Sequence, residues 1–121
     1  MTYTVEVVLR EKDFAISEEV TTPTPASRWT EDDVETALRG ILRAIDRARN
    51  PGADQSRPVV LRGFSWIVEP SEGGVVIAIE IPMGAAVAGP FDVAQEQLDA
   101  LISSALKRQQ IVSAPVGPTV H

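Results

Sequence analysis

The chain has 121 residues, of which 44% are hydrophobic and 23% are charged. This is the composition of one globular domain that is long enough to bury its own core. It has no cysteine, which excludes disulfides, thiol catalysis and cysteine-ligated zinc, and its net charge of −6 argues against nonspecific nucleic-acid binding, because phosphate contacts need a basic surface.

The N-terminal segment has the pattern of a strand. Thr2–Arg10 alternates apolar and polar residues, which predicts a strand with one buried face. Phe14–Ser17 could return as a short second strand paired with the first. The segment lacks the basic start and long apolar run of a signal peptide, and no later stretch approaches the ~20 apolar residues that span a bilayer. We therefore expect a cytoplasmic protein without membrane contacts.

A helix is predicted after the proline-containing loop Thr21–Ser27. Thr30 has the hydroxyl of an N-cap, and Asp33 lies at the position that completes a capping box. The helix should continue to about Arg49 and end at Asn50-Pro51-Gly52. Apolar residues recur on one side of this helix, as expected for a helix that covers a sheet. They are Val34, Ala37, Leu38, Ile41, Leu42, Ile45 and Ala48.

The segment Val59–Ile81 is the strongest β signal in the chain. Two β-rich runs flank Glu69–Gly74, a cluster of turn-forming residues, and this predicts a β-hairpin. One face of the hairpin should lie under the helices. Its expected residues are Phe64, Trp66, Val68, Val75, Ile77, Ile79 and Ile81.

The segment Met83–Pro90 is predicted as an apolar loop between the hairpin and a second helix. Met83, Gly84 and Gly89 are candidates for a loop that closes over a ligand, since glycines near both ends would let it move. The alternative is a buried connecting loop. The second helix should span about Val93–Gln109, with Asp92 as its N-cap.

These elements predict an α+β fold. The expected order is β-α-β-β-α, with two helices on one face of an antiparallel sheet in a two-layer sandwich. If 110–114 pairs as a short C-terminal edge strand, the order becomes ferredoxin-like. We expect residues 1–110 to form a single domain and 111–121 to form a mobile tail.

The other face of the predicted sheet is more apolar than a solvated face normally is. Its apolar residues would be Val8, Val59, Leu61, Ile67, Val76 and Ala78. A contiguous apolar patch marks a contact surface, which is covered by Phe14–Trp29, by the tail, or by a second copy of the chain. We favour self-association as a homo-oligomer, most simply a dimer. Gly40, Ala44 and Ala48 form a small-residue row on the first helix, which another helix of this chain or of a partner could approach closely.

Three arginines form a row on the polar side of the first helix. Arg39, Arg43 and Arg47 could bind an acidic partner, or they could form a solvated face partly paired with Glu35 and Asp46. The second interpretation is favoured. The acidic run Glu31–Asp33 is better explained by the helix dipole than by a bound cation, because the ligand spacing of a calcium loop is missing.

The sequence offers no catalytic constellation. His121 is the only histidine and the last residue, so no histidine-based triad can be assembled within the core. We expect no cofactor, no metal and no nucleic-acid partner, and enzyme activity is disfavoured. Three hypotheses remain open: a non-catalytic module that self-associates, a small-molecule site under the 83–90 loop, and an adaptor for an acidic partner that binds through the arginine row.

Overall fold

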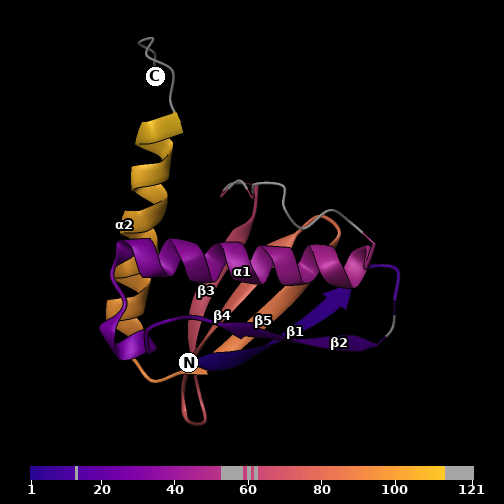
Figure 1. Ribbon diagram of the computed structural model, residues 1–121, viewed down its shortest axis with the longest axis horizontal. Coiled ribbons are helices and arrows are strands. Elements are labelled where there is room, and N and C mark those ends of the chain that lie inside the picture. The colour runs from indigo at the N-terminus through magenta and orange to yellow at the C-terminus, as the bar shows by residue number, and fades with distance from the viewer. Residues whose placement is uncertain (13, 53–58, 60, 62, 114–121) are drawn as a thin grey trace.

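A computed structural model describes residues 1–12, 14–52, 59, 61 and 63–113, with the backbone alone described for 109–113. Figure 1 shows a sheet with a long helix across it and a second helix beside β3. The elements in chain order are β1 (Thr2–Leu9), β2 (Ala15–Thr21), the 3-10 helix η1 (Ala26–Arg28), α1 (Glu31–Arg49), β3 (Ser65–Ser71), β4 (Gly74–Ile81), β5 (Gly84–Phe91) and α2 (Gln95–Ser113). The predicted α+β class, with an antiparallel sheet and two helices, is confirmed.

The sheet has five strands in the order β2-β1-β5-β4-β3, and every neighbouring pair is antiparallel. The hairpin β1–β2 and the meander β3–β4–β5 are joined by the pairing of β1 with β5, which makes β5 the central strand. The chain therefore does not form the ferredoxin-like order that we considered. Residues 110–113 lie in α2, so they are not an edge strand, and 114–121 lie outside the described residues.

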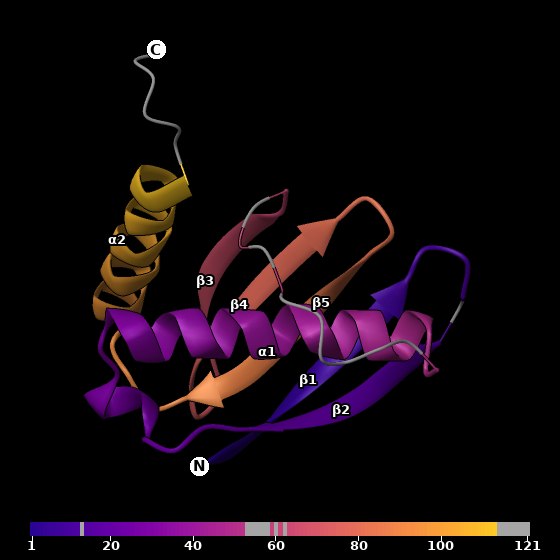
Figure 2. The same cartoon turned by 45° about the horizontal axis from the view of Figure 1, so that its top comes forward.

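One face of the sheet is buried, as the alternation in the sequence predicts. In β1, Tyr3, Val5, Val7 and Leu9 are buried, while the residues between them are exposed. α1 contacts β1, β2 and β5, and α2 contacts β3 and α1 (Figure 2). Buried side chains of both helices and of this face form one core cluster. Its largest fully buried members are Phe91, Leu9, Leu38, Ile41, Ile45, Ile77, Ile79, Leu98 and Ile102.

The start and end of α1 follow the predicted signals. The Asp33 amide donates to Thr30 Oγ1 at 3.3 Å, and the Thr30 amide donates to Asp33 Oδ2 at 2.9 Å, which completes the capping box. The helix ends at Arg49, with Asn50 as its C-cap. These two bonds satisfy donors that a helix start would otherwise leave without partners.

The second helix begins two residues later than predicted. Asp92 is not its N-cap, because α2 starts at Gln95. The Gln95 amide Nε2 instead donates to the backbone oxygen of Val68 at 2.9 Å, which ties the first turn of the helix to β3. A tertiary contact has replaced the local cap here, and spacing along the sequence gave no sign of it.

The predicted loop Met83–Pro90 is wrong: apart from Met83 it is the central strand β5. Glycine, alanine and proline are poor strand formers, so propensity alone favours a loop. Small residues are needed in β5 because it lies between β1 and β4 and packs against α1. A Cβ at Gly84 would come within 2.5 Å of the Val8 backbone oxygen, and Ala86 and Ala88 are buried. Tertiary packing has overridden local propensity.

Candidate functional site

We define the open face as the face of the sheet opposite the buried one. Its centre consists of two rows of cross-strand partners. Glu6, Val87, Ala78 and Ile67 form one row from β1 to β3, and Val8, Ala85, Glu80 and Ser65 form the next. Large apolar side chains are strongly exposed here: Val8 is 50% exposed, Val87 44% and Ile67 53%. No described residue covers them.

A shallow apolar groove of about 370 Å³ runs over β4 between β3 and β5. Its open-face lining includes Ile67, Ala78, Ala85 and Val87, with Ser65 and Glu80 at one end. The alanines make the floor low, while Ile67 and Val87 form its walls. This shape suits an apolar protrusion of another surface, because small side chains let that surface approach the sheet backbone.

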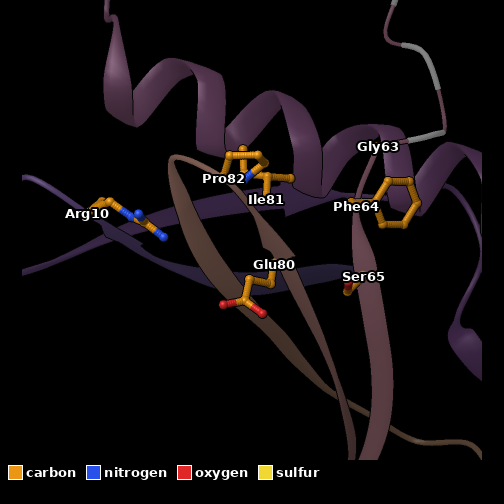
Figure 3. Close-up of a pocket in the computed structure, with 7 residues that line it drawn as sticks. All are labelled: Arg10, Gly63, Phe64, Ser65, Glu80, Ile81 and Pro82. Carbon is orange, nitrogen blue, oxygen red and sulfur yellow. The ribbon is translucent and has the colours of Figure 1, made fainter.

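A polar hollow of about 400 Å³ continues from the Glu80 end of the groove. Figure 3 shows Arg10 extending toward Glu80 across this hollow, with Ser65 and Phe64 on the opposite wall. A smaller hollow beside Val8 and Ala85 shares Arg10 and Glu80 with it. Among the described residues, neither Arg10 nor Glu80 has an ion-pair partner. The open face therefore ends in one cation and one anion that the described part of the chain leaves unpaired.

Four of the six predicted interface residues lie on the open face. Val8 and Ile67 are exposed, and Val76 and Ala78 are half-buried. Leu61 is a correction, because it is only 6% exposed and belongs to the core cluster. Val59 is half-buried and lies outside the strands, since β3 begins only at Ser65. The predicted hairpin strand was too long at its start.

Sequence reasoning missed Ala85 and Val87 because they lie in the segment predicted as a loop. The three residues predicted to form a loop over a ligand, Met83, Gly84 and Gly89, do not lie in such a loop. Met83 lies in the turn between β4 and β5 and is 45% exposed, whereas Gly84 and Gly89 belong to β5. The available sequence signal was the alternation of Val87 with Ala86 and Ala88 on the opposite face, and this signal is weak in a run of small residues.

The small-residue row of α1 faces the sheet of its own chain. A Cβ on Gly40 would come within 2.9 Å of Val20 Cγ1 in β2, and Ala44 and Ala48 are buried. The close neighbour of Gly40 is therefore a strand, where we expected a second helix or a partner. This row is not available as a contact surface.

The arginine row of α1 is largely engaged with acids of the same chain. Arg39 Nη1 lies 3.3 Å from Glu35 Oε1, as predicted for i,i+4 spacing, and Arg47 Nε lies 3.0 Å from Glu18 Oε1 in β2. Arg43 lies between them and is half-buried. The pairing of Arg47 across 29 residues of sequence could not be predicted from helical spacing.

A charged cluster joins the two helices. Arg108 Nη2 in α2 lies 2.7 Å from Asp32 Oδ1 and also contacts Glu35, while its Nη1 lies 3.6 Å from Glu31 Oε1. Hydrogen bonds to Glu35 and Asp32 raise the pKa of the Arg108 guanidinium. The acidic start of α1 thus holds a cation of its own chain, and the described residues contain no group of three or more acidic or histidine side chains suited to a metal ion.

Two further findings bear on the class of protein. Over the part of the chain that the structure describes, no helix is long and apolar enough to cross a membrane. Comparison of the chain with protein-family models, with curated proteins and with solved structures finds no significant match.

Proposed function

We propose that this protein is a non-catalytic association module, with the open face as its contact surface and a second copy of the chain as the occupant. One observation carries the proposal: Val8, Val87 and Ile67 project from β1, β5 and β3 on the same face of the sheet and are about half exposed. Scattered apolar side chains are normal on a surface, but a contiguous strip around a groove is typical of an interaction site. Burying three such side chains stabilises a complex through the hydrophobic effect.

The size of the open face supports an interface of ordinary area. Strands about 4.8 Å apart, with a rise of about 3.3 Å per residue, give a five-stranded face of roughly 600 Å² in projection. Side-chain relief adds to this value. Standard interfaces bury about 800 Å² per partner, which is of the same order.

A second copy fits this face because the apolar strip crosses the middle strand. Ala85 and Val87 belong to β5, and their neighbours Val8 and Ala78 lie on the two strands that flank it. A two-fold axis at the centre of such a patch brings each apolar half onto an equivalent surface. The alanines would let two sheets approach to about the 10 Å spacing of packed sheets.

The polar hollow supports a second candidate function. Its volume of about 400 Å³ is in the range of small-molecule pockets, and Arg10, Ser65 and Glu80 offer polar contacts. A thermal-shift screen against anionic and cationic metabolites tests this candidate, because a ligand of the native state raises apparent stability. We rank the acidic-partner hypothesis lower, since Arg39 and Arg47 are engaged within the chain.

Sedimentation velocity over a concentration series tests the proposed function. We expect Val87→Glu and Ile67→Glu to shift the protein toward monomer, because each places a charge in the apolar strip. Gln97→Glu is the matched control, since it adds the same charge at an exposed position of α2. Circular dichroism verifies that each variant is folded. Wild-type protein that stays monomeric at tens of micromolar, or strip variants that associate as the control does, would overturn the proposal.

A further inference from the structure

We infer that two copies pack open face to open face about a two-fold axis that runs along β5, with Arg10 of each copy paired to Glu80 of the other. This inference rests on the proposed function and adds the docking geometry. The structural basis is the position of two charges that have no ion-pair partner among the described residues: Glu80 lies in β4 and Arg10 directly follows β1, and these two strands flank the central strand.

The strand order supplies the symmetry. β5 is the central strand, β1 and β4 are its neighbours, and β2 and β3 are the outer strands. The axis runs parallel to β5, in the plane midway between the two facing sheets. Rotation by 180° about it leaves the position of each residue along the strand direction unchanged, and it moves residues from one side of β5 to the other. It therefore places β1 of one copy over β4 of the other, and the reverse.

The register places the two charges a short step apart along the strand direction. Val8, Ala85 and Glu80 are cross-strand partners, and Arg10 lies two residues beyond Val8, in the turn that follows β1, a step of about 6.6 Å. The Arg10 amide donates to the Met83 backbone oxygen at 2.9 Å, which fixes the Arg10 backbone beside the β4–β5 turn. The two-fold rotation places Arg10 of one copy over β4 of the other, two residues along the strand direction from Glu80. The long arginine side chain can span this distance.

The charges of the monomer are consistent with this pairing. Arg39, Arg47, Arg49 and Arg108 each pair with an acid of their own chain. Arg10 and Glu80 line the same hollow without forming an ion pair, and no other described residue pairs with either of them, so within the described part of the chain each is available to a partner. In a symmetric dimer the pair forms twice, on the two sides of β5 and at the same end of the strands. Charge pairs of this kind set register and specificity.

The rest of the open face makes both apolar and polar contacts in this arrangement, since Ile67 would lie over Ser17 of β2 and Val8 over Glu80. Ala85 and Val87 would lie near the axis and pack on their own copies, and Glu6 would lie over Ala78. The arrangement brings Glu19 and Glu69 toward each other at the rim, which is unfavourable. Both side chains are exposed, and repulsion between exposed charges is weakened by water and salt.

Charge reversal tests the pairing in the full chain. We expect Arg10→Glu and Glu80→Arg each to weaken association at least tenfold, because each creates two like-charge contacts per dimer. The double variant should return to within about threefold of wild type. Arg28→Glu is the control, since it makes the same charge change at an exposed position in η1.

The outcomes separate this inference from the proposed function. A monomeric wild type overturns both. A dimer that Val87→Glu disrupts but neither charge reversal weakens keeps the proposed function and overturns the axis. Single reversals that weaken the dimer without rescue in the double variant overturn the pair.

Discussion

Gly40 in α1 and Val20 in β2 lie so close together that a Cβ on the glycine would come within 2.9 Å of Val20 Cγ1. The Tyr3 hydroxyl lies 3.6 Å from the same point and donates to the Ala37 backbone oxygen. The helix is thus pressed onto the outer part of the sheet at the one place where its sequence has a glycine.

Gly40→Ala should destabilise the protein, although alanine is the better helix former by up to about 1 kcal/mol. Overpacking a rigid site costs about 1–3 kcal/mol, and a β-branched valine has little freedom to move away. We expect a net loss of about 1 kcal/mol in the free energy of unfolding, measured by urea denaturation. In the Val20→Ala background the same change should become neutral or stabilising. A stabilising effect in the wild-type background would contradict the close packing.

Gly84→Ala should be far more damaging than an ordinary glycine substitution. The new Cβ would come within 2.5 Å of the Val8 backbone oxygen, and a backbone atom in the sheet centre cannot move aside. We expect a loss of more than about 3 kcal/mol, the size seen when a core site is strained. Gly52→Ala is the control, because no atom of the described residues lies within 4 Å of its Cβ position. Similar melting temperatures for the two variants would show that β1 and β5 are not packed as described.

Tyr3 should make the protein sensitive to alkaline pH. Burial raises the pKa of its hydroxyl above the ordinary value of about 10. Above pH 10 the unfolded chain therefore loses a proton that the native state keeps, and stability falls by up to about 1.4 kcal/mol per pH unit. Below that pH the contribution of Tyr3 is constant.

Tyr3→Phe should remove the part of the alkaline slope that comes from Tyr3. Urea denaturation from pH 8 to pH 11 measures the slope, and absorbance at 295 nm follows ionisation of Tyr3 alone, because the chain has one tyrosine. Native protein that titrates near pH 10 at 295 nm would mean that Tyr3 is accessible to water.

Arg108 should hold α2 against α1. Arg108→Gln removes the cation that faces Asp32 and the buried Glu35, and leaves that carboxylate with less compensation. We expect a lower melting temperature and faster amide exchange in α2. Lys107→Gln removes the same charge from an exposed neighbouring position and should change neither. Equal effects of the two variants would show that the cluster contributes only through net charge.

Local signals predicted the first half of the chain well. The capping box at Thr30, the stop at Asn50 and the alternation in β1 all lie within a few residues of the structure they specify. The short return strand predicted at Phe14–Ser17 corresponds to the start of β2, which spans Ala15–Thr21 and so excludes Phe14. The predicted β-hairpin is confirmed as β3 and β4, with a shorter first strand.

The second half failed where tertiary contacts decide the structure. β5 is a strand of small residues because of the strands and helix around it, and α2 starts at Gln95, where a side-chain bond ties its first turn to β3. This dependence on tertiary contacts also prevented part of the candidate site from being predicted. Ala85 and Val87 could not be assigned to the open face before β5 was known, and Leu61 could not be recognised as core.

Light scattering on a size-exclusion column, with the wild-type chain loaded over a dilution series, tests the central claim most directly. The account predicts twice the monomer mass at high concentration, with a decrease toward the monomer mass on dilution. A constant monomer mass up to tens of micromolar would contradict self-association through the open face and would direct attention to the hollow between Arg10 and Glu80.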